Sequence, residues 1–197
     1  MIRRDAAKKV GVALSKSAWH PSPLLGQIVL ISSRNIRGEV HVAAKSWVSM
    51  VASNPPTLSL ACRISHRTAI NILETREFVV NVPGEDIASR AFAAAETLHS
   101  TLDGAPSWDL QPATKVAPPI IDECRAHIEC VLDSSKRLND EEIVLYGRII
   151  AVTIDEKLLS GDTEDRYKQL RPLIFLEEGL FGVLDAARRI EARDDQT

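Results

Sequence analysis

The side chains best suited to chemistry in this 197-residue sequence lie in residues 41–71. Lys45 is followed by Ser46, Trp47 and Ser49, so that a cation, two hydroxyl groups and an indole occur within five positions. A plain hydrophobic core does not need this mixture of groups. We therefore expect these residues to form a wall that combines apolar surface with hydrogen-bonding groups.

A second set of polar residues follows further along the same stretch. Its members are Arg63, Ser65, His66, Arg67 and Thr68. They lie where a strand expected over residues 57–65 meets a short helix expected over residues 68–75. The start of a helix exposes unpaired backbone N–H groups and the positive end of the helix dipole. Hydroxyl groups and a guanidinium placed there indicate an anion site, most naturally for a phosphate.

A purely structural interpretation of the same turn stays open. In that case the hydroxyl group of Ser65 or Thr68 caps the helix, and Arg67 lies in solvent. Taken alone, the turn favours this simpler interpretation. The anion site requires, in addition, that the wall after Lys45 lies on the same part of the folded molecule.

Alternating apolar residues predict the strands that must position these two sets. In residues 57–65, one face of the strand carries Leu58, Leu60, Cys62 and Ile64, as in a half-buried strand. Further strands are expected over residues 27–33, 39–44, 77–82, 125–133 and 142–154, with short apolar pieces at 173–175 and 180–184. The apolar run 149–152 is typical of a strand that is covered on both faces.

A helix is expected after Asp86, whose side chain can cap its start. Its apolar face repeats at helical intervals through Ile87, Ala91, Ala94 and Leu98. The connection over residues 99–119 is long for a compact domain, so Trp108 within it either covers a ligand or pins the connection to the barrel. The second interpretation is favoured.

The number of strands relative to helices predicts a mainly β protein, a barrel with a few flanking helices. We divide the chain into an N-terminal arm (residues 1–20), one domain (residues 21–185) and a charged C-terminal tail (residues 186–197). No Gly-x-Gly-x-x-Gly run suggests a dinucleotide-binding sheet, and no Gly-x-Ser-x-Gly run suggests a serine hydrolase.

The composition is that of an ordinary globular protein, with 45% hydrophobic residues, 26% charged residues and a net charge of −3. This balance argues against a protein that binds nucleic acid or a membrane surface. No stretch could span a bilayer, and the apolar run near the N-terminus is too short for a signal-peptide core. Cys62, Cys124 and Cys130 form no Cys-x-x-Cys pair, so we expect buried thiols and a reducing cytoplasm.

The histidines give no sign of a metal site. His20, His41, His66, His99 and His127 show neither His-x-x-x-His spacing nor an accompanying cluster of carboxylates. His127 lies in an expected strand, and we expect its ring to have a satisfied hydrogen bond.

Two segments carry a specific combined pattern of spacing. They are SWVSMVASNPP, residues 46–56, and HRTAINILETREFVVNVP, residues 66–83. Together they resemble the flavin reductase-like family. Weaker similarity continues through residues 127–130, 147–150 and 171–173, so the resemblance covers most of residues 20–185.

The resemblance implies an FMN-binding split β-barrel that forms a homodimer, with FAD as the alternative flavin. It implies an NAD(P)H-dependent flavin reductase, with a monooxygenase as a partner that receives reduced flavin. His127 would then contact the nicotinamide, as the less favoured alternative to its structural role. The implied cofactor-binding residues are Ala44, Lys45, Ser46, Trp47, Ser49, Met50, Cys62, Arg63, Ser65, Arg67 and Thr68.

Two positions depart from the family pattern. Ala52 stands where members often have a serine that contacts flavin, and Glu142 stands where many reductases have a histidine. A carboxylate there would repel the phosphate of a pyridine nucleotide. A non-enzymatic FMN-binding electron carrier or flavin-sensing module is therefore the alternative, and a related barrel that binds another planar ligand such as haem is a third hypothesis.

Overall fold

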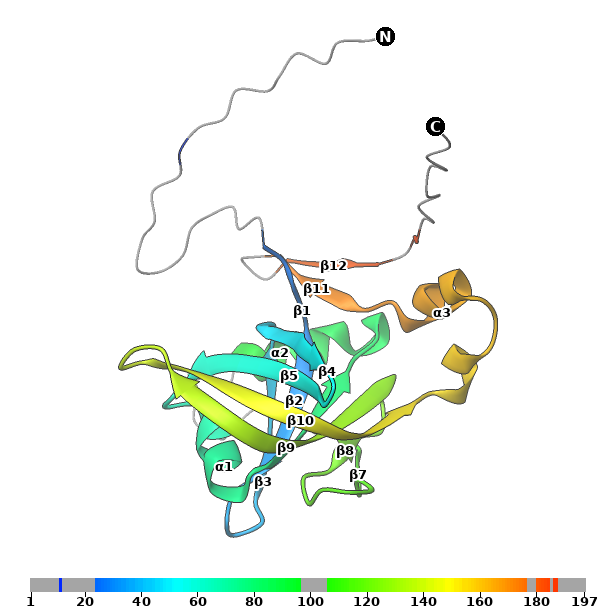
Figure 1. Ribbon diagram of the computed structural model, residues 1–197. Helices are drawn as coiled ribbons and strands as arrows, with labels where there is room; N and C mark the ends of the chain where they lie inside the picture. The colour runs from blue at the N-terminus through cyan, green and yellow to red at the C-terminus, as the bar shows by residue number, and fades with distance from the viewer. Residues whose placement is uncertain (1–10, 12–23, 97–105, 177–179, 185, 188–197) are drawn as a thin grey trace, which may run out of the picture.

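The computed structural model describes residue 11 and residues 24–96, 106–176, 180–184 and 186–187. The expected N-terminal arm falls almost entirely outside these residues, as do Leu98, His20, His99 and most of the C-terminal tail. Within the described ranges the chain is mainly β, as expected, with short helices at the periphery (Figure 1).

The central element is a seven-stranded antiparallel sheet with the strand order β3-β2-β6-β9-β10-β5-β4. Its strands are β2 (Val29–Arg34), β3 (Val40–Lys45), β4 (Val48–Ser53), β5 (Pro56–Arg63), β6 (Glu77–Val82), β9 (Ala126–Arg137) and β10 (Glu142–Ile154). The strands expected over residues 77–82 and 142–154 are confirmed at both ends. The expected strand over 125–133 is longer than predicted, because it continues into the hairpin with β10.

The chain connectivity forces this sheet to curl. β3 and β4 lie at its opposite edges, yet only Ser46 and Trp47 separate them in the sequence. Neighbouring strands lie about 4.8 Å apart and consecutive Cα atoms about 3.8 Å apart, so two residues cannot cross a flat sheet of this width. The edges must therefore approach each other where β3 ends and β4 begins, which gives a barrel (Figure 1).

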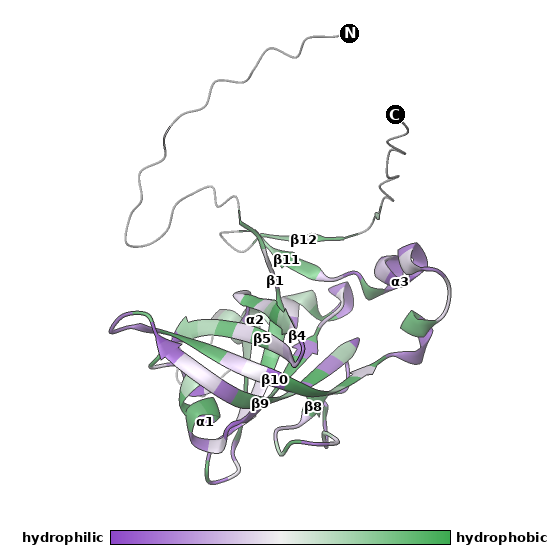
Figure 2. Ribbon diagram, in the orientation of Figure 1, coloured by the Kyte–Doolittle hydropathy of each residue, from purple (hydrophilic) through white to green (hydrophobic). Residues whose placement is uncertain are grey.

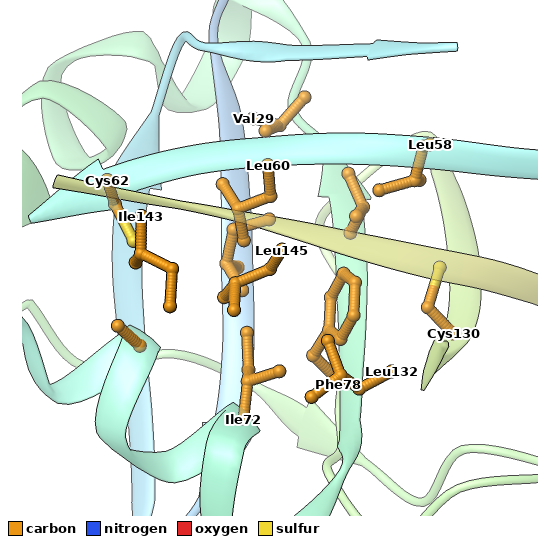
Figure 3. Close-up of a cluster of buried hydrophobic side chains, with 13 residues drawn as sticks. Val29, Leu58, Leu60, Cys62, Ile72, Phe78, Cys130, Leu132, Ile143 and Leu145 are labelled. Carbon is orange, nitrogen blue, oxygen red and sulfur yellow. The ribbon is translucent and has the colours of Figure 1, made fainter. Parts of the chain in front are cut away.

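A hydrophobic cluster fills the inside of the barrel. It gathers the inward side chains of β2, β5, β6, β9 and β10, and Ala69 and Ile72 from helix α1 (Arg67–Thr75) close it on one side. Figure 3 shows Ile72 pointing from α1 toward Leu145, with Phe78 beside them. The predicted alternation of β5 is confirmed, because Leu58, Leu60 and Cys62 all belong to this cluster.

A second hydrophobic cluster lies on the other face of the sheet. It packs Leu30 of β2 and Ala44 of β3 against Ala91 and Ala94 of helix α2 (Ala88–Glu96). Trp108 is half-buried against this cluster, with the Arg90 guanidinium 5.1 Å from the centre of its ring. The structure thus supports the interpretation that Trp108 pins its connection to the barrel.

Two small sheets and three short helical segments complete the fold. The sheets are formed by β1 (Gly26–Gln27), β11 (Leu173–Phe175) and β12 (Phe181–Val183), and by β7 (Leu110–Gln111) and β8 (Ile120–Ile121). The helical segments are the 3-10 helices η1 (Glu85–Ile87) and η2 (Glu156–Leu159) and helix α3 (Thr163–Leu170). α3 is hydrophilic and buries no residue (Figure 2). No helix in the described ranges has the length and apolar character needed to cross a membrane.

A buried carboxylate anchors the connection between α2 and β9. Glu129 of β9 is only 1% exposed. One carboxylate oxygen accepts bonds from the backbone N–H and the hydroxyl of Thr114, at 3.0 and 2.7 Å. The other oxygen accepts bonds from the N–H groups of Lys115 and Val116, at 2.6 and 3.2 Å. Burial raises the pKa of Glu129, but these hydrogen bonds outweigh it and leave the pKa below its ordinary value. The charge of Glu129 is therefore part of the fold.

Three expectations about local structure were wrong. Asp86 does not cap α2: it lies inside η1 and forms an ion pair with Arg125 at 3.0 Å instead. Neither Ser65 nor Thr68 caps α1, whose N-cap residue is His66, and no side chain makes a capping hydrogen bond there.

The third error concerns residues 149–152, which are not covered on both faces within this chain. Val152 is 60% exposed, because no element of the described chain packs over that part of β10.

Strand β4 and helix α3 were not expected. The N-cap residue of α3 is Asp162, whose carboxylate accepts a bond from the Asp165 N–H group at 2.9 Å. This capping signal was present in the sequence.

Gly147 of β10 provides a test of the interior packing. A Cβ atom at this position would collide with the Phe78 ring and lie 3.3 Å from the Cys130 Cβ atom. We predict that Gly147→Ala lowers the free energy of unfolding by about 2 kcal/mol, since overpacking a filled core forces neighbours to move. Gly182→Ala is the matched control, because a Cβ atom there meets nothing within 4 Å. Chemical denaturation should show a loss in the first variant alone.

Glu129 provides a test with a pH dependence. We predict that Glu129→Gln lowers the free energy of unfolding at neutral pH by about 2 kcal/mol, because an amide cannot accept all four bonds. The folded pKa lies below the ordinary value of 4.5, so this stabilisation is complete above that value and is lost as the pH falls through the folded pKa. The difference between the wild type and the variant should therefore shrink in acid. Glu74→Gln, at an exposed position on α1, should show no such difference.

Candidate functional site

Five polar residues lie along the barrel-facing side of β3 and at the start of α1, and we call them the basic cluster. They are His41, Lys45, His66, Arg67 and Thr68. The Nζ atom of Lys45 lies 3.2 Å from the Nδ1 atom of His66. Because an ammonium group can only donate, Nδ1 of His66 accepts this bond. The contact joins the end of β3 to the turn before α1.

The side-chain pattern of β3 explains why these residues meet. His41, Ala43 and Lys45 lie opposite Ser33, Ile31 and Val29 of β2, so they share the face that looks into the barrel. Helix α1 packs on this face, where the Asn71 amide donates to the Ser33 hydroxyl at 3.1 Å. The first turn of α1 is thereby held over the end of β3.

Lys45 is a buried cation, with only 8% of its surface exposed. Burial lowers the pKa of Lys45, and the nearby Cys62 thiol opposes the shift. Among the residues that the structure describes, no carboxylate forms an ion pair with Lys45 or Arg67. Buried charges are normally paired, so an anionic ligand is the natural partner for this part of the molecule.

The first turn of α1 adds a helix terminus to the two cations. Arg67 is its first residue, the turn contains no acidic residue, and no side chain caps it. Arg67 is exposed, and its positive charge contributes to lowering the pKa of both His41 and Glu39. Backbone N–H groups and the positive end of the dipole therefore point to the same region as Lys45 and Arg67.

Two polar atoms of the cluster are buried without a hydrogen-bond partner in the described part of the chain. They are the hydroxyl oxygen of Thr68, a residue that is 0% exposed, and the Nε2 atom of His41. Nearly all buried polar groups in proteins are hydrogen-bonded, and exceptions often mark a ligand site. The donor set of a lysine, an arginine, a hydroxyl and a helix terminus fits a phosphate group.

Four other residues predicted to bind the cofactor lie near this cluster in different environments. Cys62 is 6% exposed and lies inside the barrel near Lys45. Arg63 and Ser65 are exposed, and Arg63 lies opposite Glu142 in the pairing of β5 with β10. Ala44 points to the opposite face of the sheet, into the cluster under α2. Its side chain is therefore not brought together with Lys45.

The residues of the predicted wall lie along the edge strand β4 and its approach. Ser46 is half-buried, Trp47 is 61% exposed and Met50 is 57% exposed. Ser49 lies opposite Ser59, on the face of β5 that points away from the barrel interior. The predicted wall and the turn before α1 thus meet at the contact between Lys45 and His66. Trp47 follows Lys45 by two positions in the sequence, while the Ser49 side chain faces away from the barrel interior.

His127 lies away from the basic cluster. Its Nδ1 atom is 3.0 Å from the Oδ1 atom of Asn81, which also accepts the Ile121 N–H group at 3.0 Å. Burial lowers the pKa of His127, consistent with a neutral ring that donates to the amide oxygen. The structure shows the satisfied hydrogen bond that was expected for this residue, on the sheet face opposite Lys45.

Sequence reasoning assigned no role to His41, and it placed His66 at the helix start without counting it among the cofactor-binding residues, although both belong to the cluster. The signal for His41 was present, since residues 41 and 45 fall on one face of an alternating strand. The position of His66 depends on the turn between β5 and α1. All three cysteines are buried thiols, as expected. The described residues contain no group of three or more histidine, cysteine or carboxylate side chains that could hold a metal ion.

Comparisons with known proteins match the same region of the chain. Residues 24–183 match the model of the flavin reductase like domain. The uncharacterized protein YwrF of Bacillus subtilis (strain 168) is 31% identical over 146 residues, 68% of this chain and 71% of the relative. An uncharacterized protein of Aquifex aeolicus (strain VF5) is 24% identical over 152 residues, 73% of this chain and 76% of the relative.

Solved structures show the same fold at low sequence identity. Flavoredoxin from Methanosarcina acetivorans has a TM-score of 0.78 at 20% identity, over 96% of this chain and 97% of that chain. A protein with a split barrel domain from Shewanella frigidimarina NCIMB 400 has a TM-score of 0.74 at 17% identity, over 92% and 100%. Nitrilotriacetate monooxygenase component B from Bacillus cereus has a TM-score of 0.75 at 18% identity, over 94% and 100%. The expected split β-barrel is confirmed.

The unpartnered hydroxyl of Thr68 provides a test of the site that needs no ligand. We predict that Thr68→Val leaves the free energy of unfolding unchanged or raises it by up to about 1 kcal/mol, because it removes an unsatisfied buried group at nearly constant volume. Ser32→Ala should instead lower it by about 1 kcal/mol. The Ser32 hydroxyl is also 0% exposed but donates to the Pro119 carbonyl at 2.5 Å. Equal losses in both variants would show that Thr68 has a partner within the protein.

Proposed function

The chain belongs to the flavin reductase-like family, and from this premise we propose that it binds FMN and reduces flavin with NADH or NADPH. A bound flavin supplies the redox chemistry, since it accepts a hydride from a reduced nicotinamide and passes electrons onward. The protein has to bind the flavin, orient it and set the charge around it. No protein nucleophile is needed for this reaction.

The observation that carries the proposal is the buried cation at Lys45, which has no carboxylate partner among the described residues, beside the uncapped start of α1. Lys45 and Arg67 supply two positive charges, and Thr68 supplies a hydroxyl group with no other partner in the described chain. A terminal phosphate monoester carries close to two negative charges at neutral pH and accepts several hydrogen bonds. We therefore assign the phosphate of FMN to the basic cluster and prefer FMN to FAD, whose diester phosphates carry one charge each.

The ring end of the flavin requires apolar surface and hydrogen-bonding groups near the same place. Lys45 is followed within five positions by Ser46, Trp47 and Met50, which supply a hydroxyl group, an indole and a thioether. Cys62 and Lys45 lie at the barrel end of this region.

We further propose that the protein works in the cytoplasm as a homodimer. Several large apolar side chains are exposed, including Trp47 before β4, Met50 on β4, and Val152 and Ile154 at the C-terminal end of β10. Exposed apolar patches of this kind commonly mark protein interfaces. A monooxygenase component is the proposed recipient of the reduced flavin, by analogy with the nitrilotriacetate monooxygenase component B that shares the fold.

A second candidate function is an FMN-binding electron carrier with little turnover of nicotinamide. Glu142 favours it, because the strand register places this carboxylate opposite Arg63 at the end of β5. A negative charge there repels the phosphates of an approaching pyridine nucleotide. The two functions share the flavin site and differ only in whether NADH or NADPH reduces it efficiently.

Flavin binding provides the first test of the proposal. We predict that Lys45→Ala and Arg67→Ala each weaken FMN binding by roughly 10- to 100-fold, the usual worth of a charge-assisted hydrogen bond. Tryptophan fluorescence or visible absorbance of the purified protein during an FMN titration gives the affinity. Lys168→Ala is the control, because Lys168 is an exposed lysine on α3 that pairs with Glu164. Wild-type affinity in both site variants would show that the phosphate binds elsewhere.

Steady-state kinetics then separate the enzyme from the carrier. We expect the wild type to oxidise NADH or NADPH at a rate that depends on added FMN, and the two site variants to need more FMN to reach half of their maximal rate. A protein that binds FMN tightly but shows no FMN-dependent oxidation with either nucleotide would be the electron carrier. Glu142→Gln would then be expected to increase the rate if repulsion is the cause.

A further inference from the structure

His41 belongs to the basic cluster by its place on β3. It lies on the same strand face as Lys45, with Ser33 of β2 directly across from it. Helix α1 packs over this face, and Asn71 of α1 holds the Ser33 hydroxyl. The half-buried His41 side chain therefore lies on the side of β3 that faces the helix whose first turn carries Arg67 and Thr68.

The Nε2 atom of His41 is buried and has no hydrogen-bond partner among the described residues. The other two described histidines differ in this respect. His66 contacts Lys45 through Nδ1, and His127 contacts Asn81 through Nδ1. The unused ring nitrogen of His41 and the unused hydroxyl of Thr68 occur on two elements that face each other, which points to a single missing partner for both.

The charges around His41 are mainly positive. Lys45 on its own strand and Arg67 on α1 both act on it, whereas Ser33 and Asn71 are uncharged. Glu39 precedes it on the hairpin, but its carboxylate is occupied by the Asn35 amide and the Arg37 guanidinium. Burial, followed by the charges of Arg67 and Lys45, lowers the pKa of His41 to about 4. The ring is therefore neutral at neutral pH when the cluster holds no anion.

We propose that His41 takes up one proton when a phosphate dianion binds to the basic cluster, and so couples binding of the phosphate to binding of a proton. The proton comes from solvent and forms an N–H bond on the imidazole, while the phosphate stays dianionic and no electron moves. His41 then supplies a third positive charge and a donor to the phosphate. This inference rests on the proposed function, because it places the phosphate of FMN at the same cluster.

The physical reason is that the phosphate reverses the electric field at the ring. A unit charge about 4 Å away, at an effective dielectric constant of about 20, changes a pKa by roughly three. A dianion thus offsets the effect of Lys45 and Arg67 and favours the protonated ring. In the ligand-free protein the neutral ring avoids a further positive charge beside the buried Lys45 and the exposed Arg67. The preference of the basic cluster for a dianionic monoester over an uncharged ligand is therefore larger than Lys45 and Arg67 alone would give.

Isothermal titration calorimetry of the whole protein with FMN tests this coupling. The titration is carried out in two buffers of different ionisation enthalpy at about pH 7.5, where the phosphate ester, with a second pKa of about 6, is already a dianion. We expect uptake of close to one proton per FMN bound, and a dissociation constant that rises by up to about tenfold per pH unit above neutrality. Riboflavin, which lacks the phosphate, should bind without proton uptake.

Variants assign the proton to its residue. His41→Gln should abolish the uptake and the pH dependence while still binding FMN, and His127→Gln, at a buried histidine on the opposite sheet face, should retain both. Uptake that persists in His41→Gln, or a wild type that takes up no proton with FMN, would overturn the inference. If His41→Gln does not fold, the comparison of FMN with riboflavin on the wild type still decides whether the phosphate brings a proton.

The same measurements separate this inference from the proposed function. If Lys45→Ala and Arg67→Ala weaken FMN binding but the wild type takes up no proton, the phosphate site stands and the role of His41 is wrong. If those two variants bind FMN as the wild type does, the phosphate lies elsewhere, and the proposed site fails together with the inference.

Discussion

The two-residue connection between β3 and β4 is the constraint on which the rest of the structure depends. Ser46 and Trp47 join the opposite edges of a seven-stranded sheet, so the sheet has to close on itself at that point. Close packing there leaves no room for a larger residue at Gly26, where a Cβ atom would collide with the Ser46 carbonyl. The end of β3 is therefore fixed in place before any ligand arrives, and with it the buried ammonium group of Lys45.

The molecule contains two kinds of buried polar residue, and the contrast between them separates structure from function. Glu129 and Asn81 use their polar atoms fully, in bonds to the backbone of the connection that covers the sheet. Thr68 and His41 leave theirs unused, beside a lysine without a carboxylate partner in the described chain. The fully hydrogen-bonded Glu129 and Asn81 hold that connection in place. The unsatisfied groups of Thr68 and His41 raise the free energy of the ligand-free protein. That stored cost favours binding of a ligand that supplies the missing partner.

Much of the fold could be predicted from local pattern, because strands with one buried face alternate in sequence. β5 and the first half of β10 follow this rule, whereas β6 is a continuous run of buried residues. β4 escaped it because nearly all of its residues are exposed in the single chain, so neither face stands out as apolar. The run at 149–152 misled for the related reason that apolar composition does not reveal whether the same chain provides the cover.

The candidate site could be predicted in part for the same kind of reason. Arg67 and Thr68 were found because a cation or hydroxyl at the start of a helix has a chemical meaning by itself, and Lys45 was found because a cation next to hydroxyl groups and an indole is not typical of a core. His41 acquires its meaning only from the packing of α1 on β3, which is a tertiary contact without a local sequence signal. Asp86 shows the converse case, because a good capping residue was used instead in an ion pair with a distant arginine.

The exposed edge of β4 has a consequence for how the protein behaves at high concentration. Among the described strands, β4 is hydrogen-bonded only to β5, and its sequence VSMVAS contains no charged residue or proline to block further pairing. Soluble proteins usually guard such an edge, since its open N–H and C=O groups act as a template for extended segments of other molecules. An isolated copy of this chain therefore presents a nucleus for irreversible self-association, and the shelf life of a purified sample should depend on its concentration as much as on its temperature.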